Sequence, residues 1–536
     1  MDAADISSNS HDAADHSVER NSMISIDQKS RISRLKFGFA SSLVTQILTF
    51  SQAIIFVPFF IRVWGTEQYG EWLTLTAFLV YLTQLNLGGQ NYVQNLLTDA
   101  YVKGNEKDFI DYLSQGLSLF AAICFAAFLG VMLLLILPNF SIPGLGEQFK
   151  LEYRLVALFI GISYLISVIG GIYATAYYAV GLYAFGTMIG NLLRVSELIV
   201  LSLVLYLGAT PLIYSLTTLA LAIIRLMIHI IIMRKKIVIT KQVRISLRRA
   251  FEGRRFLKGS ILFWFIGIAA AINYQGLVSV IALKISSTAV TIYVIHRTLT
   301  AFLRYPYNLI MGPIWPELSM LASQQKFDEA SQLTIHFIKY VMLVTGLLGF
   351  FVWIWAPFVF PWWTQNEIAH NTGLMSILLI QTFVFSGWMA AGQPLLSANQ
   401  HHFVALADML NAIATITFVF ILADNLIEVA LITLICDLIF GMAMYPIITA
   451  RFLDIPRFRF LGVLLQVIVL FVPIALLTYL IYMTHQNEII YALFNTIILL
   501  IFFIPITYLL IGKTQYQRLQ RTLLATSNSI FRKLPI

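Results

Sequence analysis

Fourteen long apolar segments follow one another along this chain of 536 residues, and they constrain the fold more than any other feature. Each segment is about 20 residues or longer, the length that an α-helix needs to cross the hydrocarbon core of a bilayer. Inside that core all backbone polar groups must be paired, and a helix pairs them within one segment. We therefore predict an all-α polytopic membrane protein with about fourteen transmembrane helices, at residues 37–63, 70–97, 112–138, 153–178, 184–207, 210–233, 260–284, 290–316, 333–360, 371–397, 402–423, 427–450, 459–484 and 488–511.

The composition excludes the main soluble classes. Charged residues make up only 11% of the chain, against about 25% in an ordinary soluble domain. This supply of charge is too small to cover the surface of a large soluble enzyme or a nucleic-acid-binding protein. The two cysteines, Cys124 and Cys436, lie inside apolar segments, so a disulfide framework is not indicated.

The basic residues predict how the chain crosses the membrane. If the N-terminus is cytoplasmic, 26 of the 35 Lys and Arg residues fall in cytoplasmic segments and four on the opposite side. Cytoplasmic loops of membrane proteins carry such an excess of positive charge. We therefore expect both termini in the cytoplasm, and the net charge of +9 reflects topology. The predicted location is the bacterial inner (plasma) membrane.

A basic segment between the sixth and seventh apolar segments divides the chain. It holds ten cations and one acid, Glu252, and is predicted either to bind anionic lipid headgroups or to act only as a positively charged linker. The predicted organisation is a polar tail (1–34), a six-helix bundle (35–233), the basic linker (234–258), a second six-helix bundle (259–450), two extra helices (451–512) and a C-terminal tail (513–536).

The two predicted bundles resemble each other at a fixed offset. The connection that begins at Thr98 and the one that begins at Leu318 both follow a polar segment and carry a Lys and Asp/Phe cluster. Leu113 and Leu333, where each connection re-enters the membrane, are 220 residues apart. Six helices per repeat give both bundles the same orientation. The sequence therefore predicts two bundles related by a pseudo-twofold axis, as in alternating-access transporters.

Two blocks of the sequence resemble one family. FVPFFIRVWGTEQYGEWLTLTAFLVYLTQLNLGG, from Phe56, contains a Gly-x-x-x-Tyr-Gly-x-Trp loop, and the block from His296 contains Pro-Glu-Leu-Ser at residues 316–319. Both are similar to bacterial polysaccharide flippases, the O-antigen and exopolysaccharide branch of the multidrug/oligosaccharidyl-lipid/polysaccharide exporter superfamily. The resemblance covers nearly the whole chain. It departs from the family pattern at Asn86, where an acidic residue is expected.

The resemblance implies a function and its partners. It implies a flippase that moves an undecaprenyl-diphosphate-linked oligosaccharide across the inner membrane by alternating access, for O-antigen, capsule or exopolysaccharide synthesis. Further implied partners are membrane lipids, a glycan polymerase and chain-length machinery, and no nucleic acid. Two alternatives stay open. One is a cation-coupled multidrug antiporter of the same superfamily, and the other is a membrane glycan polymerase or acyltransferase.

Charged residues inside the apolar segments are the first candidates for a site. An arginine at the centre of a membrane helix costs at least about 2.5–3.5 kcal/mol, and its planar fork suits phosphate oxygens. We predict that Arg194, Arg225, Arg297 and Arg304 line a substrate cavity. The alternatives are snorkelling or pairing with acids. Arg194 and Glu197 can pair within one helix. The candidate coupling or gating acids are Glu197, Asp408 and Asp437.

Amide side chains are the second set of candidates. Several gather in the second apolar segment, where a lipid-facing helix cannot carry them cheaply. They predict a wet cavity for hydroxyl-rich sugars, and the alternative is hydrogen bonding between helices. The candidates are Gln46, Gln90, Asn91, Gln94, Asn273 and Gln275. No phosphate-binding loop, metal-ligand spacing or catalytic constellation is visible, so we expect no metal, no cofactor and no enzymatic activity.

Overall fold

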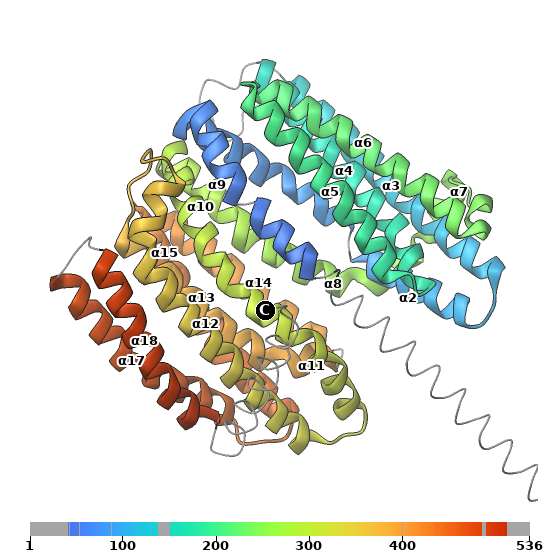
Figure 1. Ribbon diagram of the computed structural model, residues 1–536. Helices are drawn as coiled ribbons and strands as arrows, with labels where there is room; N and C mark the ends of the chain where they lie inside the picture. Colours follow the sequence, from blue (N-terminus) through green and yellow to red (C-terminus); the bar gives the residue numbers. More distant parts are fainter. Residues whose placement is uncertain are drawn as a thin grey trace, which may run out of the picture.

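The computed structural model describes residues 41–511, apart from 42, 53, 87, 138–150, 399 and 485–488. All regular elements within these ranges are helices, arranged as two bundles with a helical pair on one flank (Figure 1). The first bundle contains the helical stretch Leu43–Asn86, α2 (Gly89–Val102), α3 (Glu106–Ile136), α4 (Leu151–Ala179), α5 (Tyr183–Tyr206) and α6 (Pro211–Lys236).

The linker and the second bundle complete the chain. The linker forms a short turn, η3 (Val238–Gln242), and the helix α7 (Leu247–Gly253). The second bundle contains α8 (Arg255–Ala271), η4 (Ile272–Gly276), α9 (Leu277–Lys284), α10 (Ser287–Ala301), η5 (Phe302–Arg304), α11 (Tyr305–Ser323), α12 (Phe327–Trp363), α13 (Thr372–Ser397), α14 (His401–Leu422), α15 (Leu426–Cys436), η6 (Asp437–Ala443) and α16 (Met444–Phe452). The flanking pair is α17 (Arg459–Thr484) and α18 (Ile489–Ile511).

Twelve helical stretches in the described ranges are long and apolar enough to cross a membrane. The first of them, Leu43–Asn86, has 44 residues, which is about twice the length that one crossing requires. It is folded back on itself at Gly65, so it supplies two crossings. The consecutive helices α10 and α11 supply a further one, although neither qualifies alone. Counted this way, the described chain contains the fourteen crossings that the sequence predicts.

Gly65 is the turn of this first hairpin. Its φ of 74° lies in the left-handed region that glycine adopts without strain. Phe60 and Trp72 would be about 18 Å apart along a straight helix. Their ring centroids are instead 6.3 Å apart, and Phe60 stacks on Tyr69 at 4.9 Å. The residues of the Gly-x-x-x-Tyr-Gly-x-Trp motif therefore build a hairpin tip closed by aromatic rings.

The second and eighth crossings are interrupted, whereas the sequence predicts one continuous segment for each. The second changes to a 3₁₀ turn, η1 (Val80–Asn86), and restarts as α2 after Gly88, whose φ is 67°. The Gly88 amide donates to Asn86 Oδ1 at 2.9 Å. The eighth is interrupted at η5, directly before Pro306, which has no amide hydrogen to continue the helix.

Several helices start at a capping side chain that accepts a backbone amide. Thr210 caps α6 ahead of Pro211, and Ser286, Asn371 and Asn425 cap α10, α13 and α15. These residues satisfy amides that a helix terminus leaves unpaired, at a value of about 1 kcal/mol each. The local sequence therefore determines where these crossings begin.

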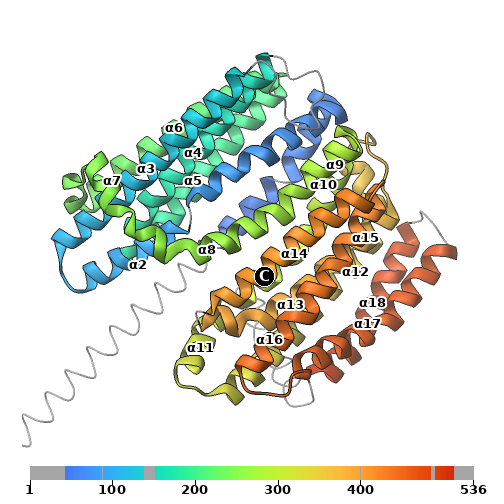
Figure 2. The ribbon, with the colours of Figure 1, turned by 180° about the vertical axis from the view of Figure 1, so that it is seen from behind.

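The two bundles pack against each other near the Gly65 hairpin, which we call the Gly65 end. One apolar cluster there joins Phe56, Phe60 and Leu75 of the first bundle to Ile295 and Phe360 of the second. From this contact the ribbons of the two bundles diverge (Figures 1 and 2). The pair α17–α18 packs outside the second bundle, against α12.

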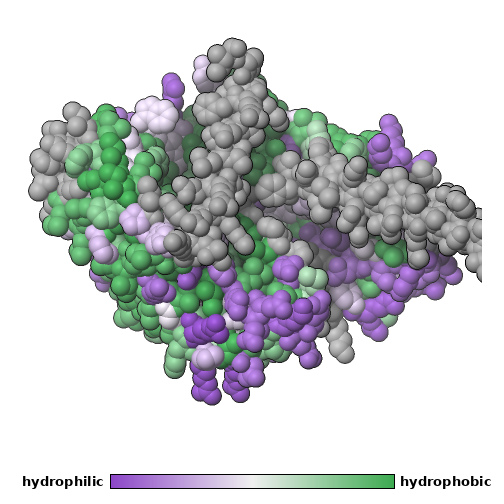
Figure 3. Space-filling view, turned by 60° about the horizontal axis from the view of Figure 1, so that its bottom comes forward, coloured by the Kyte–Doolittle hydropathy of each residue, from purple (hydrophilic) through white to green (hydrophobic). Residues whose placement is uncertain are grey.

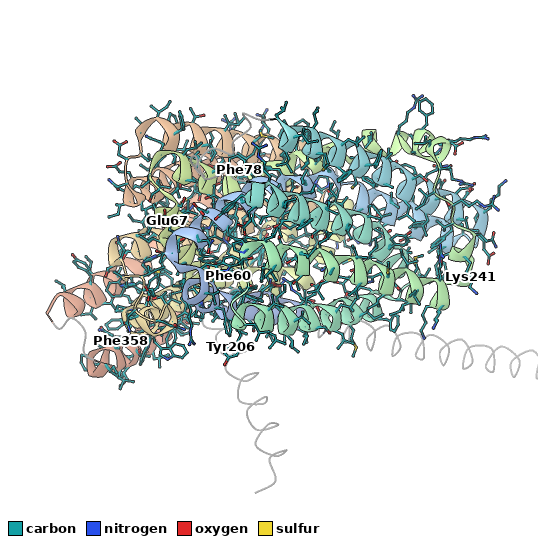
Figure 4. All side chains as sticks on the ribbon, turned by 90° about the horizontal axis from the view of Figure 1, so that it is seen from above. Phe60, Glu67, Phe78, Tyr206, Lys241 and Phe358 are labelled. Atoms are coloured by element: carbon teal, nitrogen blue, oxygen red, sulfur yellow. The ribbon has the colours of Figure 1, made fainter. Side chains whose placement is uncertain are left out.

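The opposite end carries the linker, and we call it the basic end. Lys241 of η3 and Glu67 of the hairpin lie at opposite ends of the molecule (Figure 4). Hydrophilic side chains gather along the lower and right part of the face in Figure 3, and apolar side chains cover much of the left part.

Candidate functional site

Each bundle contains an open cavity lined in part by charged side chains. The C-bundle cavity, of about 240 Å³, lies among α8, α10, α13, α14 and the turns η4, η5 and η6. The N-bundle cavity, of about 560 Å³, lies among the first helical stretch, α4, α5 and α6. All seven charged residues that the sequence analysis selected line one cavity or the other: Arg297, Arg304, Asp408 and Asp437 in the C-bundle, and Arg194, Glu197 and Arg225 in the N-bundle.

Arg297 of α10 reaches across the C-bundle cavity to the turn η4. Its Nη1 donates to the Tyr274 carbonyl at 2.7 Å, and its guanidinium lies 3.6 Å from the centroid of the Tyr274 ring. Tyr274 belongs to a π-helical turn, whose widened backbone interrupts the regular helical hydrogen bonds. The Nε of Arg297 is buried without a hydrogen-bond partner among the described residues. The Nε–H group of Arg297 is thus an unpaired donor among the described residues.

Arg304 is held by an aromatic ring. It sits in the η5 interruption, and its guanidinium lies 4.2 Å from the centroid of Phe385 on α13. A cation over a ring face is stabilised by about 0.5–2 kcal/mol without using any N–H donor. Its Nε is also buried without a hydrogen-bond partner in the part of the chain that the structure describes. Each of the two arginines that line this cavity therefore has one unpaired donor among the described residues.

Two carboxylates share this cavity with the arginines. Asp437 accepts from Gln381 Nε2 at 2.9 Å and from Asn411 Nδ2 at 2.8 Å. Asp408, one helical turn before Asn411, accepts from the Tyr445 hydroxyl. Neutral side chains thus donate hydrogen bonds to both carboxylates. Pairing of these acids with arginines was one of the alternatives expected from the sequence.

The N-bundle cavity contains an ion pair between two helices. Glu197 of α5 lies 3.1 Å from Arg225 Nη1 of α6, and Arg225 Nη2 also donates to Ser167 of α4 at 3.0 Å. Arg194 instead donates to Gln52 Oε1 at 2.9 Å from Nη2 and 3.3 Å from Nε. The pairing of Arg194 with Glu197 along one helix is therefore replaced by a link between α5 and α6, because Arg225 faces the carboxylate directly.

The two cavities occupy equivalent places in the two bundles. Gly170 lies as far before the end of α4 as Trp388 lies before the end of α13, and both line their cavities. The next residues, Gly171 and Met389, are again paired in this way. Counted from the helix ends, large side chains thus line the second cavity where glycines line the first.

The amide candidates are spread over several places. Asn273 lines the C-bundle cavity. Gln90 donates to the Val168 carbonyl at 3.3 Å, which ties α2 to α4. The side chain of Asn91 lies outside the described residues. The remaining candidates are half-buried and do not line either cavity: Gln46, Gln94 and Gln275.

Several cavity residues were not among the candidates predicted from the sequence. Gln381 and Asn411 hold Asp437, Tyr274 holds Arg297, and Trp388 fills one wall. Asn411 follows Asp408 by one helical turn, and Gln381 interrupts an apolar run, so both could have been recognised in the sequence. Tyr274 and Trp388 could not, because aromatic residues are common in membrane helices. The described residues contain no group of three or more His, Cys, Asp or Glu placed to hold a metal ion.

This architecture, two six-helix bundles that meet at one end, has counterparts among solved structures. No protein-family model matches the sequence, and no curated protein matches it. Among solved structures, the chain is similar to the lipid II flippase MurJ in an inward closed conformation, with a TM-score of 0.63 and 13% identity, covering 88% of this chain and 98% of that one. It is also similar to a multidrug resistance MATE family transporter of the MOP superfamily in an inward-facing conformation, with a TM-score of 0.62 and 12% identity over 76% and 94%.

An outward-facing conformation of a MATE family transporter gives a lower TM-score, 0.54, at 12% identity, over 79% of this chain and 95% of that one. At these identities the likeness establishes the fold. It makes the chain a multi-pass membrane protein with the fold seen in these structures.

Proposed function

We propose that the protein is a flippase for a polyprenyl-diphosphate-linked oligosaccharide of surface polysaccharide synthesis. The observation that carries this proposal is the pair Arg297 and Arg304, which line one cavity and each have a buried Nε without a hydrogen-bond partner among the described residues. A diphosphate cannot cross about 30 Å of hydrocarbon without charge-assisted hydrogen bonds. Guanidinium groups supply them. The structural likeness to MurJ, a lipid II flippase, supports a lipid-linked substrate in general.

The N-bundle cavity extends the same chemistry. Arg194 and Arg225 give it two further cations, and Asn191 and Ser167 add groups that bind hydroxyls. It also has more room than the C-bundle cavity. We assign the sugars to the larger cavity and the diphosphate to the smaller one. The oligosaccharide would then lie across both bundles, with the polyprenyl chain in lipid.

The direction of transport follows from the two ends. In this proposal the basic end is cytoplasmic and both termini lie on that side, because the linker carries the excess of positive charge. The bundles are joined at the Gly65 end, so the state described here admits substrate from the basic end. Closing the basic end and separating the Gly65 end would release the substrate to the outer leaflet. Protonation of Glu197, Asp408 or Asp437 is the proposed coupling step.

The test is complementation in a bacterium that lacks its own lipid-linked repeat-unit flippase. We expect the wild-type chain to restore surface polysaccharide, and Arg297→Gln and Arg304→Gln to leave the lipid-linked repeat in the cytoplasmic leaflet at equal expression. Arg154→Gln is the matched control, because Arg154 Nη1 donates to the Leu135 carbonyl at 2.9 Å, away from both cavities. Full export by both cavity variants would contradict the assigned role of the arginines.

A cation-coupled multidrug antiporter is the second candidate. The paired observations in its favour are the likeness to MATE transporters and the two carboxylates, Asp408 and Asp437, in the C-bundle cavity. Of the charged residues that line the two cavities, four are arginines and three are acids, which favours an anionic substrate. Efflux of cationic dyes from cells that express the chain, lost in Asp408→Asn, would support this candidate instead.

A further inference from the structure

The linker helix α7 presents an apolar edge that the protein leaves uncovered. Leu247 is 84% exposed, Phe251 65% and Ile245 56%. The spacing of Leu247 and Phe251 is four residues, so they lie on one face of the helix. Exposed apolar side chains this large need a partner or a lipid surface.

Basic side chains flank this apolar edge. Arg244, Arg248, Arg254 and Lys241 are all exposed, and among the described residues Arg248 pairs only with Glu252 on its own helix. The Arg254 guanidinium lies 4.0 Å from the centroid of the Phe251 ring. A short amphipathic segment with aromatic and leucine side chains beside cations is the pattern that binds in the headgroup region of a bilayer.

Contacts with α3 fix α7 firmly. Arg249 Nη1 lies 2.7 Å from Asp111, and the amide of Ser246 donates to Ser118 Oγ at 3.1 Å. A Cβ at Gly253 would lie 2.8 Å from the Gln115 carbonyl, so the two backbones touch. The apolar edge is therefore held in place rather than carried on a loose loop.

The level of α7 along the bundle matches the membrane surface. On α3 the outward-facing apolar side chains begin at Phe125, just beyond the residues that contact α7. On α6 the exposed apolar residues end at Ile231 and three exposed cations follow at 234–236. The surface of α3 thus changes from water-facing to lipid-facing next to α7, and that of α6 changes where the chain enters the linker.

We infer that the segment 244–254 binds anionic phospholipid headgroups, with Leu247 and Phe251 inserted between the lipids. The cations select the lipid by charge, at roughly fivefold in affinity for each one near the surface. The apolar edge supplies the insertion. A water-soluble protein partner would instead have to cover apolar side chains that lie at the level of the lipid.

The test uses the full-length protein in nanodiscs and a dye at residue 251. Phe251→Cys is labelled with the apolar dye bimane, and the native Cys124 and Cys436 are buried and react slowly. We expect lipids with brominated chains to quench the dye strongly in discs that contain phosphatidylglycerol, and weakly in discs of phosphatidylcholine alone. Raising the salt from about 0.1 M to about 1 M should reduce the quenching, because the screening length falls from about 10 Å to about 3 Å.

Charge variants make the test specific. Replacing Arg244, Arg248 and Arg254 with Gln should lower quenching in phosphatidylglycerol discs to the phosphatidylcholine level. Arg249 and Arg255, which bind Asp111 and Gln115, are kept so that α7 stays docked. Lys326→Gln, an exposed cation between α11 and α12, is the matched control and should change nothing. Equal quenching in both kinds of disc, or none in either, would overturn the inference.

Discussion

The Cα atom of Gly70 lies against the backbone of Ser287, so that a Cβ at residue 70 would stand 1.9 Å from the Ser287 carbonyl oxygen. This is a contact between the two bundles at the Gly65 end. The adjacent hydrogen bond, from Thr291 Oγ1 to the Thr66 carbonyl at 2.7 Å, reinforces it. The second glycine of the hairpin motif therefore joins the bundles, whereas the first only turns the chain.

Gly70→Ala should separate the bundles at this end. A methyl group cannot fit against a backbone oxygen, and such overpacking costs about 1–3 kcal/mol in the state described here. The check is a spin-label distance between Arg62→Cys and Glu367→Cys, two exposed positions at the Gly65 end. We expect longer distances in Gly70→Ala.

Gly65→Ala is the matched control for that experiment. A Cβ at Gly65 meets nothing within 4 Å, and its cost is only about 1 kcal/mol for the left-handed backbone. The protein should lose some thermal stability while the distance between the labels stays the same. Equal distances in all three proteins would show that Gly70 does not hold the bundles together.

Glu197→Gln should destabilise the first bundle by about 1–3 kcal/mol, because it leaves the half-buried Arg225 guanidinium without its counter-charge. Arg194→Gln should cost less, since its partner Gln52 is neutral. Thermal unfolding of the purified protein in detergent measures both. A smaller loss for Glu197→Gln than for Arg194→Gln would argue against the α5–α6 ion pair.

Asp437→Asn should be tolerated better than Asp437→Leu. The amides of Gln381 and Asn411 can flip to present oxygen to an Asn amide, so we expect a change below about 1 kcal/mol. Leucine has a similar volume but leaves both amides unpaired, at a cost of about 2–4 kcal/mol. The measurement is again thermal unfolding, and equal losses would contradict this account of the network.

Acid should destabilise the protein through His370, which lies between α12 and α13. Burial disfavours the charged ring and lowers the pKa of His370 to about 4, against about 6.5 in an unfolded chain. Between these values the unfolded state binds more protons, so stability falls as the pH drops from about 6.5 and this contribution levels off near 4.

Melting temperatures of the detergent-solubilised protein across this pH range provide the check. His370→Asn should flatten the slope, and His402→Asn, at an exposed position, should leave it unchanged. An unaltered slope in His370→Asn would assign the acid sensitivity to another group.

Much of the fold could be predicted from the sequence, because apolar length and basic loops are strong signals. The interruptions of the second and eighth crossings were harder to predict from the sequence. Gly88 and Pro306 signal a possible break, but apolar content on both sides makes the segment look continuous. The candidate charges were found because a charge within an apolar helix is conspicuous. The partners of these charges depend on how the helices are rotated about their axes, as Glu197 and Arg225 illustrate. That rotation cannot be read from a single sequence.

One consequence of the linker geometry concerns mechanical coupling. Arg254 both ends α7 and precedes α8, so no flexible connection separates the surface helix from the first helix of the second bundle. Phe256, at the start of α8, is packed in the apolar cluster of the first bundle, while η4 at its far end contributes to the C-bundle cavity. The helix α8 therefore connects the linker helix α7 directly to the C-bundle cavity. If the segment 244–254 binds lipid as proposed, a change in the lipids around α7 would be transmitted along α8 to Tyr274.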